Sequence, residues 1–155
     1  ARALENFSGV KRRLELRGTP GGIAIFDDFA HHPTAIAVTL EAMRDRIGVG
    51  SGRLLAVIEP RSATMKEGHH GVALAAATAA ADEVFWYEPP GLSWPLAALV
   101  ADQAGQSVWH DIDTVVDAVV GTAKAGDAVV VMSNGGFGGI HEKLLQRLGK
   151  TEDVG

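Results

Sequence analysis

The chain has 155 residues, of which 46% are hydrophobic and 21% charged, a balance typical of a folded domain and not of a disordered segment. Its formal net charge is −5 and only 6% of its residues are aromatic, which argues against a nucleic-acid-binding protein that works by neutralising phosphates. The absence of cysteine excludes disulfide bonds, thiolate metal sites and cysteine nucleophiles, and no apolar run is long enough to span a membrane.

Short apolar runs alternate with helical patterns along the whole chain. In chain order, the runs predict strands at residues 10–17, 23–26, 54–58, 83–87, 107–109 and 128–132. Helices are predicted from about residue 33 to 47, over 72–81 and 96–104, from the acidic residues at 111 and 113 onward, and from 140 to about 150, before a frayed tail at 151–155. The helical prediction rests on spacing, since the apolar residues from Ile36 to Ile47 recur at intervals of four, three and four residues.

Strands that alternate with amphipathic helices predict an α/β fold. We expect a Rossmann-like, three-layer domain with a mostly parallel sheet of about six strands and helices on both faces. Ligands of such sheets bind beyond the carboxyl ends of the strands. Candidate functional residues are therefore expected in the four loops that leave those ends, at residues 27–33, 59–70, 87–95 and 133–139.

The first of these loops combines carboxylates with imidazoles in the run Asp27-Asp-Phe-Ala-His-His-Pro33. Asp28 can accept hydrogen bonds from sugar hydroxyls, and His31 and His32 can meet a base or a phosphate, so the loop is a candidate ligand site. Two other interpretations stay open: an acidic helix N-terminus and a two-histidine metal site. Adjacent histidines rarely ligate one ion together, which makes the metal site the weakest of the three.

The second loop places basic side chains after a buried strand, in the run Glu59-Pro-Arg-Ser-Ala-Thr-Met-Lys66. The guanidinium of Arg61 offers a planar fork for a carboxylate or phosphate, and Lys66 offers a mobile point charge. A solvated loop with ordinary surface charges explains the same pattern equally well.

The last loop is rich in glycine, in the run Ser133-Asn-Gly-Gly-Phe-Gly-Gly-Ile-His141. Glycine allows close backbone approach, and the helix N-terminus that follows favours an anion. The run is neither a Walker A motif nor a dinucleotide-binding fingerprint, because the required lysine and the following βαβ unit are absent. A flexible turn is the other interpretation, but four glycines within residues 135–139 exceed what a turn needs.

A further basic cluster, Gly9-Val-Lys-Arg-Arg13, lies on the first predicted strand. Its side chains can reach a phosphate. Alternatively, lysine and arginine there protect an edge strand from aggregation.

Four motifs in order resemble the C-terminal domain of the Mur ligases. They are Phe7-Ser-Gly-Val-Lys-Arg-Arg-Leu-Glu15, Asp27-Asp-Phe-Ala-His-His-Pro-Thr34, Glu59-Pro-Arg-Ser-Ala-Thr-Met-Lys66 and Met132-Ser-Asn-Gly-Gly-Phe-Gly-Gly-Ile-His141, within a resemblance that covers residues 7–149. The second motif is shared with the Mur ligases that add L-alanine. The third and fourth resemble the peptidoglycan-recycling Mur ligases, which add a tripeptide.

The resemblance implies that residues 1–150 are the third domain of a longer cytoplasmic bacterial enzyme, with its own N-terminal and central domains as partners. It implies ATP-dependent joining of L-Ala-γ-D-Glu-meso-diaminopimelate to UDP-N-acetylmuramate through an acyl phosphate, with Mg held mainly by the central domain. The isolated domain is then expected to be inactive. Other possibilities are an alanine-adding ligase, a stand-alone nucleotide-binding module and a metal-binding protein. No nucleic-acid or membrane partner is expected.

The resemblance also implies roles for individual residues, which divide into two groups. Nucleotide binding is implied for Arg13, at the ATP phosphates, for Asp28, at the ribose, and for His31 and His32, near the nucleotide or the incoming amine. Binding of the incoming peptide is implied for Arg61, Lys66, Ser133, Asn134 and Phe137. A tripeptide needs more room than alanine, and the glycines at 135–139 leave that room.

Overall fold

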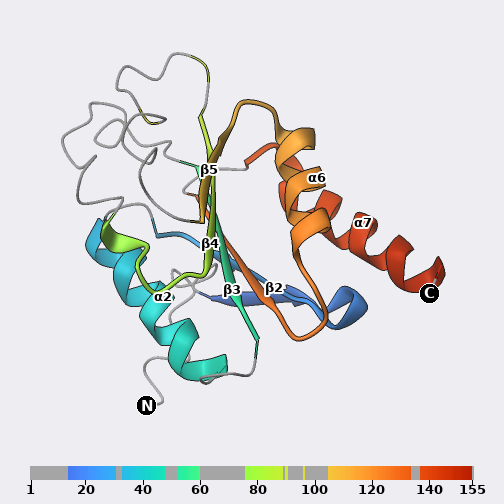
Figure 1. The fold of residues 1–155 in the computed structure, drawn as a ribbon, viewed down its shortest axis with the longest axis horizontal. Coiled ribbons are helices and arrows are strands. Elements are labelled where there is room, and N and C mark those ends of the chain that lie inside the picture. Colours follow the sequence, from blue (N-terminus) through green and yellow to red (C-terminus); the bar gives the residue numbers. More distant parts are fainter. Residues whose placement is uncertain are drawn as a thin grey trace, which may run out of the picture.

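A computed structural model of the chain describes residues 14–30, 33–47, 52–59, 76–88, 90, 96, 105–133 and 137–154. Within these residues the chain forms a six-stranded sheet covered by helices on both faces (Figure 1). The predicted α/β fold and its mostly parallel sheet are confirmed. In the described part of the chain, every helix is too short or too polar to cross a membrane.

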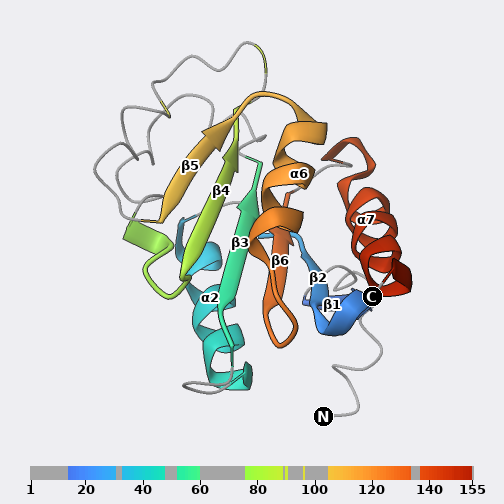
Figure 2. The same ribbon diagram turned by 45° about the vertical axis from the view of Figure 1, so that its right-hand side comes forward.

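The sheet has the strand order β1-β2-β6-β3-β4-β5 (Figure 2). Only the first pair, β1 with β2, is antiparallel, and the four other pairs are parallel. The last strand therefore lies between β2 and β3, at the centre of the sheet. The strand bounds are Glu15–Gly18 for β1, Ala24–Asp28 for β2, Leu54–Ile58 for β3, Glu83–Tyr87 for β4, Gln106–Trp109 for β5 and Ala128–Met132 for β6.

Each face of the sheet has its own hydrophobic core, because successive side chains of a strand point to opposite faces. In β3, Leu54, Ala56 and Ile58 pack on the side of helix α2 (Pro33–Ile47), whereas Leu55 and Val57 pack on the other side. That other side is covered by α6 (Ile112–Thr122) and α7 (Ile140–Val154) (Figures 1 and 2). Burial on both faces explains why β3 and β6 are apolar throughout.

The chain leaves neighbouring strands toward opposite faces. After β2 it continues to α2 on one face, and after β6 it continues through the short 3₁₀ turn η3 (Phe137–Gly139) to α7 on the other face. Because β2 and β6 are paired along their length, their carboxyl ends form a switch point, the place where α/β sheets bind ligands.

Most predicted elements agree with the structure. The strands at 54–58, 83–87 and 128–132 and the helix at 33–47 are confirmed residue for residue. Strand β2 is longer than predicted, because both aspartates continue the pairing with β6. The predicted helix at 72–81 ends early, in a turn at 78–80, and its beginning lies outside the described residues. The predicted helix at 96–104 lies almost wholly outside them, and α7 continues past residue 150 to Val154.

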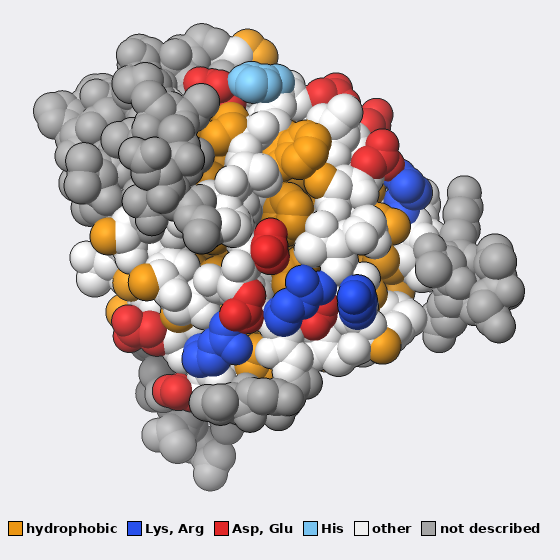
Figure 3. Space-filling model, in the orientation of Figure 1, with side chains coloured by type: hydrophobic (Ala, Val, Ile, Leu, Met, Phe, Trp, Pro, Cys, Tyr) orange, Lys and Arg blue, Asp and Glu red, His pale blue; other side chains and the backbone are white. Residues whose placement is uncertain are grey.

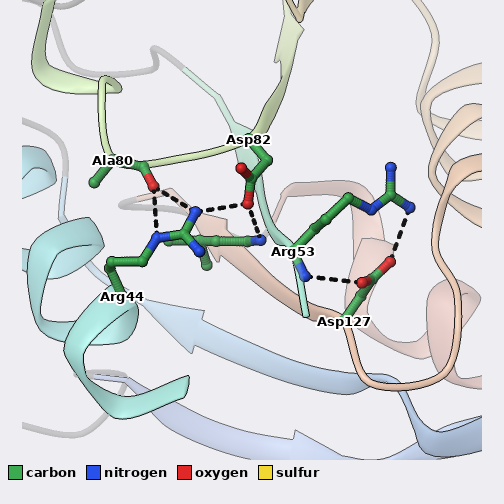
Figure 4. Close-up of polar contacts among 6 residues, drawn as sticks. Arg44, Arg53, Ala80, Asp82 and Asp127 are labelled. Atoms are coloured by element: carbon green, nitrogen blue, oxygen red, sulfur yellow. Dashed lines mark hydrogen bonds and ion pairs between the residues drawn. The ribbon is translucent and has the colours of Figure 1, made fainter. Parts of the chain in front are cut away.

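Two aspartates, the buried Asp127 and the exposed Asp82, tie together the amino ends of β3, β4 and β6 (Figure 4). Asp127 accepts hydrogen bonds from the backbone N–H groups of Arg53 (3.0 Å) and Lys124 (2.8 Å) and from Arg53 Nη2 (2.9 Å). Asp82 accepts from Arg44 Nη2 (2.6 Å) and from the N–H of Leu54 (2.8 Å). The space-filling view shows acidic and basic side chains beside one another toward the bottom of the molecule, where these strands begin (Figure 3).

These contacts change the acidity of both aspartates. Burial raises the pKa of Asp127, but hydrogen bonds from the N–H groups of Arg53 and Lys124 and from the Arg53 guanidinium outweigh burial, and the pKa lies below its usual value. Burial likewise raises the pKa of Asp82, and the Arg44 side chain and the Leu54 N–H lower it further than burial raises it. Both side chains are therefore held as carboxylates that brace the amino edge of the sheet.

Candidate functional site

The candidate site is the carboxyl edge of the sheet, where β2, β6, β3 and β4 end side by side. Three of the predicted site residues, Asp28, Ser133 and Phe137, are described there. The other six, Arg13, His31, His32, Arg61, Lys66 and Asn134, lie outside the described residues. The structure thus describes the part of the candidate site that is formed by the strand ends and η3.

Asp28 ends β2 and is almost completely buried on the α2 side of the sheet. Its Oδ1 accepts a hydrogen bond from the N–H of Leu14 (2.8 Å), and its Oδ2 accepts from the N–H of Ala30 (2.8 Å) and from Thr39 Oγ1 (3.2 Å). The carboxylate therefore fixes the start of β1, the start of the loop after β2, and helix α2 to one another.

Ser133 follows β6 and is fully buried. Its hydroxyl donates to Oε1 of Glu59 (2.6 Å), and its N–H donates to the carbonyl oxygen of Asp28 (3.2 Å). Glu59 is itself buried, and its N–H donates to the carbonyl oxygen of Met132 (3.0 Å). Ser133 thus connects the ends of β2, β6 and β3.

Phe137 begins η3 with a φ of 50°, in the left-handed region that side-chain-bearing residues rarely adopt. Gly138 (φ 58°) and Gly139 (φ 73°) continue the left-handed path. The ring of Phe137 is fully buried and lies 5.6 Å from that of Tyr87, centroid to centroid. Burial of a large aromatic ring offsets the roughly 1–2 kcal/mol of backbone strain at this position.

Tyr87 forms the wall beside Phe137 at the end of β4. Its partial burial, together with the nearby carboxylates of Glu59 and Asp111, raises the pKa of its hydroxyl. The hydroxyl therefore stays protonated at neutral pH and can act as a hydrogen-bond donor.

The site also contains a buried pair of side chains that the sequence does not predict. Nε2 of His141, in the first turn of α7, lies 2.9 Å from Oδ1 of Asp27, and both side chains are buried. Arg17 Nη1 of β1 contacts the other oxygen of Asp27 at 3.5 Å. Asp27 and His141 both stand within the quoted motifs, but nothing in their spacing signals contact, since they are 114 residues apart. The contact of Glu59 with Ser133, 74 residues away, is likewise not predicted by the sequence.

The described side chains at this edge are mainly carboxylates, hydroxyls and aromatic rings. Among residues 14–30, 33–47, 52–59, 76–88, 105–133 and 137–149, no three His, Asp or Glu side chains come together in a way that can hold a metal ion. The edge instead offers buried carboxylates, hydroxyls and an aromatic wall of Tyr87 and Phe137. The buried groups are already bonded within the chain and hold the shape of the edge, whereas the half-buried Tyr87 is accessible to a ligand.

A family model described as "Mur ligase, glutamate ligase domain" matches residues 12–135. This range contains all the predicted site residues except Phe137. The chain is 50% identical, over 99% of its length, to the UDP-N-acetylmuramate–L-alanyl-γ-D-glutamyl-meso-2,6-diaminoheptandioate ligase of Escherichia coli K12, and covers 34% of that protein. It is 38% identical, over 97% of its length, to the UDP-N-acetylmuramate–L-alanine ligase of Streptomyces coelicolor, of which it also covers 34%.

A solved structure shows the same similarity in three dimensions. The chain superposes on a murein peptide ligase of Psychrobacter arcticus with a TM-score of 0.81 and 46% identity, covering 96% of this chain and 32% of that one. The chain therefore spans about a third of the length of the relatives that it matches.

Proposed function

The chain belongs to the Mur ligase family, in which it corresponds to the C-terminal domain, and from this premise we propose that the protein carrying it is an ATP-dependent, amide-bond-forming ligase. We propose as its substrates UDP-N-acetylmuramate and the tripeptide L-Ala-γ-D-Glu-meso-diaminopimelate. The carrying observation is the difference in identity: 50% to the tripeptide-adding ligase of E. coli against 38% to the alanine-adding ligase of S. coelicolor.

The proposed reaction makes an amide in two steps. The carboxylate of UDP-N-acetylmuramate attacks the γ-phosphorus of ATP, which gives an acyl phosphate and ADP. The amino group of the tripeptide then attacks the acyl carbon, phosphate leaves, and the nitrogen loses a proton. An acyl phosphate hydrolyses readily in water, so closure of this domain over the reactants both excludes water and orients the amine.

On the nucleotide side, we propose that Arg13 reaches the ATP phosphates, that Asp28 contributes to the ribose site, and that His31 and His32 lie near the nucleotide or the incoming amine. The buried carboxylate of Asp28 supports this assignment in one respect, because it fixes the start of the loop that leads to both histidines. A ribose contact would be additional to its three hydrogen bonds within the chain.

On the peptide side, we propose that Arg61 and Lys66 receive carboxylates of the tripeptide, and that Ser133, Asn134 and Phe137 form the far side of its site. Ser133 and Phe137 are buried, which supports a role in shaping this wall. The tripeptide is polyanionic, so arginine and lysine are the chemically matched partners.

Magnesium accompanies ATP in the proposed reaction, and the described residues supply no cluster that fits it. We therefore propose that Mg is held by the central domain of the complete protein, which we place in the cytoplasm. This domain's own contribution is to close over ATP and to receive the peptide.

A phosphate-release assay on the full-length protein tests the proposal. ATP, magnesium and UDP-N-acetylmuramate are supplied in every tube, with the tripeptide in one and L-alanine in another. Release with the tripeptide alone is the expected result. Release with L-alanine alone would identify an alanine-adding ligase, and release with neither would favour a nucleotide-binding module without ligase activity.

A further inference from the structure

Two consecutive aspartates at the end of β2 hold the two helical layers of the domain. Because neighbouring side chains of a strand point to opposite faces, Asp28 faces α2 and Asp27 faces α7. Asp28 bonds to Thr39 of α2 at 3.2 Å, and Asp27 contacts His141 of α7 at 2.9 Å. The switch point is therefore braced from both sides by adjacent residues.

Burying the polar side chains of Asp27 and His141 to attach helix α7 costs desolvation free energy. Asp27 is 1% exposed and His141 7%. A buried polar pair of this kind is often no more stabilising than well-packed apolar side chains of similar volume, whereas it fixes one relative geometry. Described charges near the pair include Arg17, which contacts Asp27 at 3.5 Å, the exposed Glu142, which contacts Arg17 at 3.9 Å, and Glu15, which is paired with Asp27 across the β1–β2 ladder.

The pair stands at one end of the glycine-rich loop. Ser133 anchors the beginning of the loop through its hydrogen bond to Glu59 (2.6 Å), and His141 anchors its end through Asp27. Between the anchors, Phe137 to Gly139 follow the left-handed path described above, with the ring of Phe137 buried. A left-handed backbone at a non-glycine residue persists only where the surroundings enforce it.

We propose that Asp27 and His141 are positioning residues, which hold residues 137–139 in the shape that receives the incoming peptide. The inference rests on the proposed function for the identity of that peptide. Its geometric part, that the pair enforces the path of residues 137–139, stands on the contacts alone. Neither side chain is proposed to touch the substrate.

The experiment compares four variants of the full-length protein with the wild type. H141L removes one partner and leaves Asp27 buried. D27V/H141L replaces the whole pair by apolar side chains, which restores stability but not the fixed geometry. H141Q keeps an N–H donor at nearly the position of Nε2. D127A destabilises the opposite edge of the sheet and serves as the control for stability loss alone.

Steady-state kinetics separate a positioning role from a structural one. We expect H141L and D27V/H141L to raise the KM for the tripeptide about tenfold while the KM for ATP stays within about twofold. H141Q is expected to recover the tripeptide KM to within about threefold, and D127A to leave it unchanged below its melting temperature. Recovery of the wild-type KM in D27V/H141L, or an equal rise in both KM values, would overturn the proposal. If H141L does not fold, the double variant decides.

Hydrogen exchange tests the geometric part without any substrate. The backbone N–H groups of residues 137–139 are expected to exchange at least about tenfold faster in D27V/H141L than in wild type, with no change at Arg53 and Lys124. Unchanged exchange would refute the positioning role whatever the enzyme's substrate. If exchange is faster in D27V/H141L as expected but the wild-type protein does not use the tripeptide as a substrate, only the proposed function is refuted.

Discussion

At the amino edge of the sheet, Asp82 and Asp127 are held by the guanidinium groups of arginines and by backbone N–H groups. At the carboxyl edge, the buried carboxylates of Asp27, Asp28 and Glu59 are met by an imidazole, by two hydroxyls and by backbone N–H groups, with a longer 3.5 Å contact from Arg17. Ion pairs with arginine hold the edge where the strands begin. The edge where they end keeps its acidic groups buried, in hydrogen-bond networks beside the loops.

This difference separates stability from binding. Contacts at the amino edge join β3 to α2 and to the residues just before β4 and β6, and they hold no loop that we place in the proposed function. Contacts at the carboxyl edge hold the starts and ends of loops that we do place there. Substitutions at the first edge should therefore change the free energy of unfolding, and substitutions at the second should change substrate constants.

The largest effect is expected for Asp127→Ala. It leaves the N–H groups of Arg53 and Lys124 and the Arg53 guanidinium without their buried acceptor, which should cost about 3 kcal/mol of unfolding free energy. Urea unfolding of the 155-residue chain measures the loss, and Arg147→Ala, whose contact to Asp117 is exposed, is the control. Equal, small losses of unfolding free energy in both variants would mean that the contacts of Asp127 do not stabilise the amino edge more than a surface ion pair does.

Arg61→Ala should have the next largest effect, on the binding of the proposed peptide. Loss of one charge-assisted contact is worth about 1.5–3 kcal/mol, or a rise of roughly ten- to more than a hundredfold in the tripeptide KM. The KM for ATP should change far less. Initial-rate kinetics on the full-length protein compare the two constants, and equal rises in both would contradict the assignment of Arg61.

Gly138→Ala is expected to cost about 1–2 kcal/mol, because a side chain is unfavourable at a φ of 58°. The new Cβ would also lie 3.1 Å from Cγ1 of Ile112. Gly121→Ala, in α6 with open space around its Cβ, is the matched control and should be neutral or slightly stabilising. Thermal unfolding of both variants checks the difference, and a Gly138→Ala protein as stable as wild type would argue against a rigid turn.

The smallest expected effect is on the pH dependence of stability, which comes from the two aspartates at the amino edge. The folded pKa values of Asp82 and Asp127 lie below their ordinary values, so the stability they contribute is complete above the unfolded pKa, near 4, and is lost as the pH falls through the folded pKa. In Asp127→Asn, this part of the acid-induced loss should disappear. Melting temperatures from about pH 6 to pH 2 test it, and curves of identical shape for the two proteins would refute it.

Much of the fold follows from local pattern. The spacing of Ile36, Leu40 and Met43 predicts α2, and all three residues are buried under the sheet. The apolar runs of β3 and β6 predict strands buried on both faces, as observed. The end of β2 was harder to predict, because aspartate is rare in strands and only pairing with β6 extends the strand through Asp28.

The candidate site was less predictable than the fold. Asp28, Ser133 and Phe137 are predicted because they stand in polar or glycine-rich loops that resemble Mur ligase motifs, and all three lie at the carboxyl edge of the sheet. The sequence does not predict the contacts of Asp27 and Glu59, because their partners, His141 and Ser133, are 114 and 74 residues away. Contacts at such separations depend on strand order, which no local pattern encodes. The roles of Arg13, His31, His32, Arg61, Lys66 and Asn134 stay predictions.

The central place of β6 has a consequence for how the chain folds. Strands β2 and β3 each pair with β6, the last strand in the described order. During synthesis, the pair β1–β2 and the group β3–β5 cannot form one sheet until β6 leaves the ribosome. Until then, the edges of β2 and β3 that pair with β6 stay unpaired. Contacts of such large sequence separation slow folding and lengthen exposure to aggregation. Chaperone dependence of newly made chains should therefore rise with any delay in adding residues 128–132.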